Sequence, residues 1–70
     1  MKEKTIQEKI ALNIRLHRLR KGLKQEQLAE LLDMTQQHIS LLEKAASMPK
    51  LTTLMKLAEV FGTTVDDLLH

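Results

Sequence analysis

The side chains best suited to chemistry in this 70-residue chain lie between positions 36 and 41. Ile39 and Leu42 mark the inward side of a predicted helix, and four side chains fall on its outward side, namely Gln36, Gln37, Ser40 and Leu41. A glutamine amide can pair with the N6/N7 edge of adenine through two hydrogen bonds, and an outward leucine can lie against a thymine methyl group. A merely solvated helix face would usually carry Glu and Lys. The pattern therefore favours a surface that reads DNA bases.

The residues that would position this surface run from Gln25 to Lys44. Apolar residues recur at helical spacing in the first half of this window, at Leu28, Ala29, Leu31 and Leu32. The triplet 33–35 then interrupts the pattern, and the Thr35 hydroxyl is a natural cap for the following helix. Ala29 is small where two closely joined helices must approach, and Met34 would fill the turn. The window predicts a helix-turn-helix, although any helical hairpin in a small bundle would share its apolar spacing.

Five stretches carry a resemblance to a known family: NIRLHRLRKGL at 13–23, QEQLAELLDMTQQHISLLEK at 25–44, Pro49, LTTLMKLAEVFG at 51–62 and TTVDDLL at 63–69. Together they are similar to the phage-repressor and Cro-like (Xre-type) helix-turn-helix family. The TQQHI run is especially similar to lambdoid phage repressors. The resemblance implies an all-α, five-helix, lambda-repressor-like DNA-binding domain. It also implies a transcriptional regulator, foremost a repressor, that binds a double-stranded DNA operator as a homodimer.

The resemblance further implies a set of DNA contacts. The base-reading residues would be Gln36, Gln37, Ser40 and Leu41, with Ser40 nearer the backbone. The backbone-contacting residues would be Lys24, Gln25, Thr35, Lys44 and Lys50. Gln25 would donate to a phosphate, helped by the free amides at its helix start. Arg18 and Glu43 match a structural ion pair between the first and third helices, with a weak surface pair as the alternative. His38 is interpreted as a solvated side chain.

Two features depart from the family pattern. Asp33 and Ala45 stand where most members have Gly in the turns before and after the third helix. Ala in the left-handed region costs about 1–2 kcal/mol, so either this strain is accepted or the third helix ends differently. The following residues, 46–48, also lack the basic or amide side chains that often hold phosphates there. We expect phosphate affinity to be below that of a typical member, with Lys44, Lys50 and a basic first helix supplying it.

The charge of the chain is unevenly distributed. The formal net charge is +2, but residues 1–24 hold eight Lys or Arg against two Glu, whereas residues 25–43 carry a charge of −4 and residues 44–70 balance at zero. A basic N-terminal third would attract phosphates, although a charge cluster is as often a solvated face. The candidates are Arg15, Arg18, Arg20, Lys21 and Lys24.

The sequence predicts a single domain over residues 1–70 with five helices, at about 5–21, 25–32, 36–44, 51–61 and a short segment after Thr64. Thr5, Thr35 and Thr64 are the expected N-caps, and Gly22 and Gly62 the expected helix stops. The expected core is Ile10, Ile14, Leu28, Ala29, Leu32, Met34, Ile39, Leu42, Leu54, Leu57, Ala58, Phe61, Val65 and Leu68. The first helix carries a second apolar stripe at Leu12, Leu16 and Leu19. Burial over a wide arc is favoured for this stripe, and contact with a partner is the alternative.

Other classes of function have little support in the sequence. The chain has no Cys and therefore no thiolate metal site, and its three His residues are scattered, so neither a metal nor a cofactor is expected. No glycine-rich phosphate loop or local nucleophile–base set suggests an enzyme. No apolar run approaches the length of a membrane span, so a cytoplasmic protein is expected. The main alternative is a protein-interaction module, or an antitoxin-like protein with a protein partner, that binds DNA weakly; Leu41 and the residues after Ala45 favour it.

Overall fold

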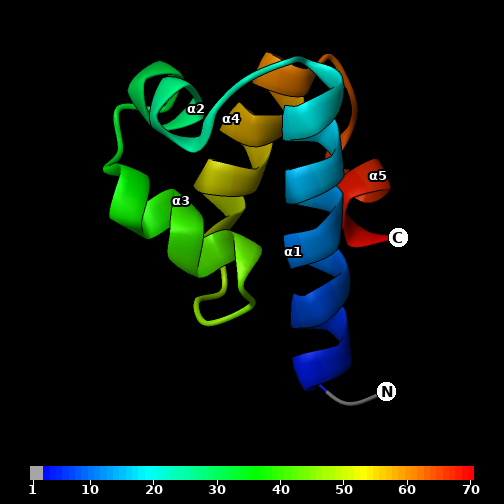
Figure 1. The fold of residues 1–70 in the computed structure, drawn as a ribbon. Coiled ribbons are helices and arrows are strands. Elements are labelled where there is room, and N and C mark those ends of the chain that lie inside the picture. The colour runs from blue at the N-terminus through cyan, green and yellow to red at the C-terminus, as the bar shows by residue number, and fades with distance from the viewer. Residues whose placement is uncertain (1–2) are drawn as a thin grey trace.

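The computed structural model describes residues 3–70, with side chains from Thr5 onward, and within this range it contains helices and no strand. The helices are α1 (Glu3–Arg20), α2 (Gln25–Leu31), α3 (Gln36–Glu43), α4 (Leu51–Phe61) and α5 (Val65–Leu69). Helix α1 packs against α3, α4 and α5, while α2 packs across α3 and α4 contacts α5 (Figure 1). This arrangement confirms the predicted all-α fold with five helices.

The core lies where α1 meets the other helices. Its buried members are Ile10, Ile14, Leu28, Ala29, Leu32, Ile39, Leu42, Leu54, Leu57, Ala58, Phe61 and Leu68. Met34 and Val65, also predicted as core, are only partly buried, because they lie in or next to short turns at the edge of the cluster. The His17 and Phe61 rings stack with centroids 5.3 Å apart and join α1 to α4. Helix α5 is held to α1 by Asn13, whose Nδ2 donates to the Leu68 carbonyl at 3.0 Å.

Local capping explains where α3 and α5 begin. The Thr35 hydroxyl accepts from the His38 amide at 3.1 Å, and the Thr64 hydroxyl accepts from the Asp67 amide at 3.1 Å, which confirms two predicted caps. The predicted cap at Thr5 is wrong, because α1 already includes Glu3. Neither Gly nor Pro lies before Thr5 in the sequence to stop the helix from extending toward the N-terminus.

Four of the helices end in the same turn. In each turn an amide bonds to the carbonyl five residues earlier, as in Leu23 to Arg18 at 3.1 Å and Met34 to Ala29 at 2.8 Å. The residue before that amide has a positive φ: 70° at Gly22, 56° at Asp33, 60° at Ala45 and 69° at Gly62. The helices predicted to end at Lys21, Leu32 and Lys44 end one residue earlier, because each of these residues already belongs to its turn.

The second apolar stripe of α1 is not buried. Leu12, Leu16 and Leu19 are 55%, 38% and 54% exposed, so the expectation of burial over a wide arc is wrong. The neighbouring helices contact the side of α1 that carries Ile10 and Ile14, and no described residue covers the opposite side. These three residues are called the leucine stripe below.

Candidate nucleic-acid interface

Helix α3 is joined to α1 by a bidentate ion pair. Arg18 Nε donates to Glu43 Oε2 at 2.6 Å and Arg18 Nη2 donates to Glu43 Oε1 at 3.0 Å. The two side chains are 11% and 4% exposed, so the pair lies in the interior and the alternative of a weak surface pair is wrong. Arg18 Nη1 also donates to the Leu23 carbonyl at 2.8 Å. Because Arg18 is buried and engaged at all three nitrogens, it is not available for the phosphate contact that its charge suggested.

Two glutamines add further contacts around the C-terminal half of α3. Gln25 Nε2 donates to Glu43 Oε1 at 3.2 Å, and Gln7 Nε2 donates to the Ala45 carbonyl at 2.8 Å. Sequence reasoning did not find either contact, since the partners lie 18 and 38 residues apart. The Gln25 amide has a second N–H, so its predicted phosphate contact stays a prediction with only part of the side chain available.

The opposite face of α3 points away from the protein. Ile39 and Leu42 are buried, whereas Gln36 and Gln37 are exposed, Leu41 is 41% exposed and Ser40 is half-buried. The four predicted base-reading residues therefore share one accessible side of α3. Their amide and hydroxyl groups and the leucine methyl groups can meet base edges there if α3 enters a groove.

The predicted backbone-contacting residues lie at the ends of helices around this face. Lys24 immediately precedes α2, Thr35 immediately precedes α3, and Lys44 immediately follows it. Lys50 immediately precedes α4, and all four of these residues are exposed. The Thr35 hydroxyl already accepts a hydrogen bond as a helix cap, but it retains its own proton for donation. The structure thus places Lys24, Thr35 and Lys50 at helix N-termini, where phosphate groups commonly bind, and Lys44 at the C-terminal end of α3.

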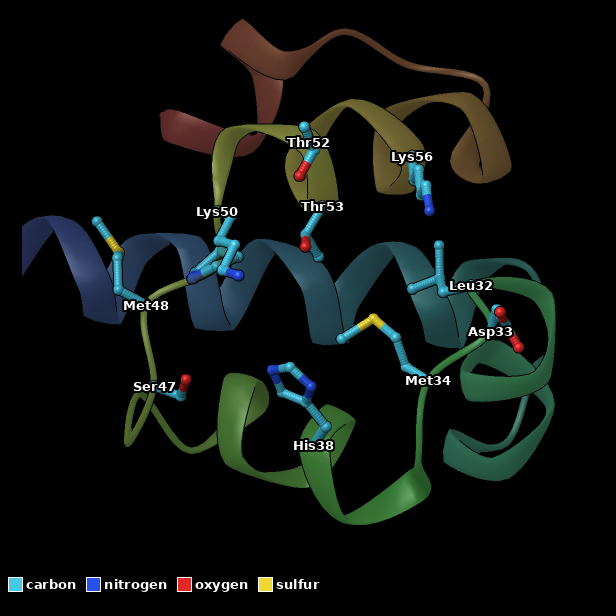
Figure 2. Close-up of a pocket in the computed structure, with 11 residues that line it drawn as sticks. Leu32, Asp33, Met34, His38, Ser47, Met48, Lys50, Thr52, Thr53 and Lys56 are labelled. Carbon is cyan, nitrogen blue, oxygen red and sulfur yellow. The ribbon is translucent and has the colours of Figure 1, made fainter.

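A hollow of about 300 Å³ lies beside α3, between the turn that precedes α3 and the start of α4 (Figure 2). Its polar lining consists of Asp33, His38, Ser47, Lys50, Thr52, Thr53 and Lys56. His38 projects from α3 toward the segment that carries Lys50 and Thr53 (Figure 2). Two lysines, a histidine and three hydroxyls in this lining can donate to an anionic group such as a phosphate, whereas the Asp33 carboxylate opposes it. Of these residues, sequence reasoning assigned only Lys50 to DNA, because the others meet it only in the folded chain.

Comparison with known proteins agrees with this geometry. Residues 14–68, most of the chain, match the family model described as helix-turn-helix. The chain belongs to the helix-turn-helix family. This result confirms the resemblance to Xre-type proteins, and it places this helix-turn-helix protein in the class of DNA-binding transcription regulators.

Solved structures share the fold over nearly the full length. A hypothetical transcription factor NHTF from Neisseria is 27% identical, with a TM-score of 0.87 over 100% of this chain and 82% of its own. The clp gene regulator ClgR from C. glutamicum is 25% identical, with a TM-score of 0.83 over 91% of this chain and 83% of its own. None of the curated proteins compared with the chain is a significant match.

The same fold also occurs as a minor part of an enzyme. Hydroxypropylphosphonic acid epoxidase from S. wedmorenis is 26% identical, with a TM-score of 0.88 over 96% of this chain but only 36% of the epoxidase. The likeness concerns a helical portion of that protein and carries no argument for catalysis here. Within residues 3–70 no helix combines the length and apolar character needed to cross a membrane.

Proposed function

We propose that this protein is a sequence-specific transcription regulator, foremost a repressor, that binds a double-stranded DNA operator as a two-fold homodimer with α3 in the major groove. One observation carries the proposal. The inward side of α3 is bound to the scaffold through Glu43, while its outward side presents Gln36, Gln37 and Leu41 to solvent. A helix held firmly on one side and exposed on the other is suited to present side chains to base edges.

The proposed contacts divide into reading and holding. Gln36, Gln37, Ser40 and Leu41 read bases, whereas Lys24, Gln25, Thr35, Lys44 and Lys50 hold the phosphate backbone. Lys56 joins the holding group, because it lines the same hollow as Lys50. Reading contacts change the preference among sequences, and holding contacts act on all sequences alike.

Selection from a pool of random duplexes, followed by sequencing of the bound fraction and footprinting, tests the proposal. We expect a symmetric site with half-sites centred about 34 Å apart, one helical turn of DNA. An asymmetric footprint over one half-site, or affinity indifferent to sequence at physiological salt, contradicts it.

Matched variants separate the two kinds of contact. Gln36→Ala and Gln37→Ala should each relax discrimination at one or two base pairs by about 1–3 kcal/mol. Lys44→Ala should weaken binding to all sequences. It should also make the plot of log binding constant against log salt concentration less steep, by about 0.9 in slope. Lys9→Ala serves as the control for loss of a surface charge, because the exposed Lys9 lies on α1 beside Leu69 and His70.

A second candidate function is a protein-interaction module, including an antitoxin-like protein, with weak DNA binding. The exposed leucine stripe and the absence of basic side chains at residues 46–48 favour it. Under this hypothesis the two Gln substitutions weaken every sequence equally, so the same experiment distinguishes the two candidates.

A further inference from the structure

The leucine stripe is an apolar seam on an otherwise charged surface. Leu12, Leu16 and Leu19 are spaced by four and three residues, the spacing of successive d, a and d positions in a coiled coil. They lie opposite the buried Ile10 and Ile14, so they point away from the core. The stripe spans residues 12–19 of α1, about 12 Å or two helical turns, which is the length over which another helix can pack along it.

The charges beside the stripe are mostly positive. In this register Arg15 is a g position on one side of the stripe and Arg20 is an e position on the other, while Lys9 lies one heptad before Leu16, at the N-terminal end of the stripe. All three side chains are exposed, and Glu8 is the one acidic residue near them among the described residues of this face. Charged residues beside an apolar seam determine which helix can pair with it. A matching helix must therefore carry acidic residues beside its own apolar seam.

We infer that the leucine stripe binds an amphipathic helix of a partner protein, with apolar residues at coiled-coil spacing and acidic residues on both flanks. A second copy of this chain fits less well, because a two-fold antiparallel pairing centred on Leu16 would bring the two Arg15 side chains together. A lipid surface also fits less well. Helices that lie in membranes have a broad apolar face, whereas two to three leucines per two turns form the narrow seam typical of helix pairing.

This inference does not rest on the proposed DNA contacts. The side of α1 that faces α3 carries Arg18 and Gln7, whereas the leucine stripe lies on the outward side. The partner helix would thus bind without covering Gln36 and Gln37. A regulator built in this way can hold a partner and an operator at once, and failure of either binding activity would leave the other unchanged.

The test uses two synthetic peptides of three heptads, about 21 residues, each labelled with a fluorophore. Both carry Leu at the a and d positions; one carries Glu at the e and g positions and the other carries Lys. In anisotropy titrations with the full chain, we expect the Glu peptide to bind at least about ten-fold more tightly than the Lys peptide, and more weakly as salt rises.

Variants of the chain assign the binding to the stripe. Leu16→Ser should lower affinity for the Glu peptide about ten-fold or more, the loss expected for one buried leucine. Leu31→Ser is the matched control, because Leu31 is also exposed, at 60%, but lies on α2. Arg15→Glu combined with Arg20→Glu should shift the preference toward the Lys peptide. Circular dichroism at 222 nm confirms that each variant is folded.

Four outcomes overturn the inference. The first is equal affinity for the two peptides, and the second is peptide binding that Leu16→Ser leaves unchanged. The third is a dimer in sedimentation that Leu16→Ser converts to a monomer, which assigns the stripe to a second copy. The fourth is binding of the native chain, but not of Leu16→Ser, to vesicles containing phosphatidylglycerol while neither peptide binds, which assigns the stripe to a membrane surface.

Discussion

The ends of α1 and α4 differ from the ends of α2 and α3 in one residue of an otherwise identical turn. All four turns contain the same backbone hydrogen bonds and a residue with φ between 56° and 70°. That residue is Gly22 after α1 and Gly62 after α4, but Asp33 after α2 and Ala45 after α3. Because a left-handed Ala costs about 1–2 kcal/mol and Asp adopts this region more readily, the turn after α3 is the most strained of the four. The orientation of α3 is therefore maintained against unfavourable backbone energy.

The compensating contacts lie along α3 and α1. Glu43 accepts hydrogen bonds from Arg18 and Gln25, and the Ala45 carbonyl accepts one from Gln7. The glycine turns also have side-chain contacts among the described residues, because Arg18 Nη1 donates to the Leu23 carbonyl and the Thr63 hydroxyl donates to Asp67 Oδ2. Tertiary contacts to Glu43 and to the Ala45 carbonyl thus support the turn after α3, whereas glycine removes the backbone strain from the turns after α1 and α4.

The largest effect is expected from removing the side-chain anchor of α3. Glu43→Ala leaves the buried Arg18 without its partner and should reduce the free energy of unfolding by about 3–5 kcal/mol. A domain of this size has about 4–10 kcal/mol of stability in total, so the variant should be partly unfolded at 37 °C. Urea unfolding followed by circular dichroism measures the change.

Apolar replacement of both charges provides the control for this prediction. Arg18→Met combined with Glu43→Leu should recover most of the lost stability, because a well-packed apolar pair can replace a buried ion pair at little net cost. A loss below about 1 kcal/mol for Glu43→Ala alone would show that the ion pair does not compensate for the strain beside α3.

The next largest effect is expected at the glycine turns. Gly22→Ala and Gly62→Ala should each reduce stability by about 1–2 kcal/mol, less the gain of about 0.4–1 kcal/mol from a stiffer unfolded chain. A Cβ atom at either position would meet nothing within 4 Å beyond its own chain neighbours, so the backbone angle alone is tested. A loss above about 3 kcal/mol would indicate that these turns depend on more than φ.

The reciprocal substitution tests the strained turn after α3. Ala45→Gly should relieve about 1–2 kcal/mol of backbone strain and lose about 0.4–1 kcal/mol through the freer unfolded chain. The net expectation is a gain of up to about 1 kcal/mol, measured as a higher urea midpoint at unchanged m-value. A clear loss of stability would mean that residue 45 continues the helix, where Gly costs about 1 kcal/mol.

The smallest effect is expected at the turn before α3. Asp adopts the left-handed region more readily than Ala, so Asp33→Gly should change stability by less than Ala45→Gly, within about 0.5 kcal/mol of zero. The two variants are compared in parallel urea titrations. A gain at position 33 as large as that at position 45 would show that Asp and Ala are equally strained here.

Features determined by neighbouring residues were predictable from the sequence. Helical spacing located α2 and α3, and the caps at Thr35 and Thr64 follow from side chains that bond amides three residues ahead. The positive φ at Gly22 and Gly62 follows from the residue type. Arg18 and Glu43 were found only through the family resemblance, because their spacing of 25 residues carries no local signal.

Features determined by how helices pack were not predictable. The leucine stripe was expected to be buried, and this expectation failed. Spacing shows which residues share a face of α1, but it does not show how many helices cover that face. The polar hollow depends in the same way on where the start of α4 lies relative to α3. The contact between Gln7 and Ala45 requires the full path of the chain through α2 and α3.

The stacked rings of His17 and Phe61 give the molecule a spectroscopic reporter. The chain has one Phe, no Tyr, no Trp and three His, so the magnetic shielding of the His17 ring protons has a single aromatic source. Those protons should resonate upfield in the folded protein and move to ordinary shifts when α1 separates from α4. The chemical shifts of the His17 ring protons can thus report whether α1, which bears the leucine stripe, remains in contact with α4, which lines the hollow.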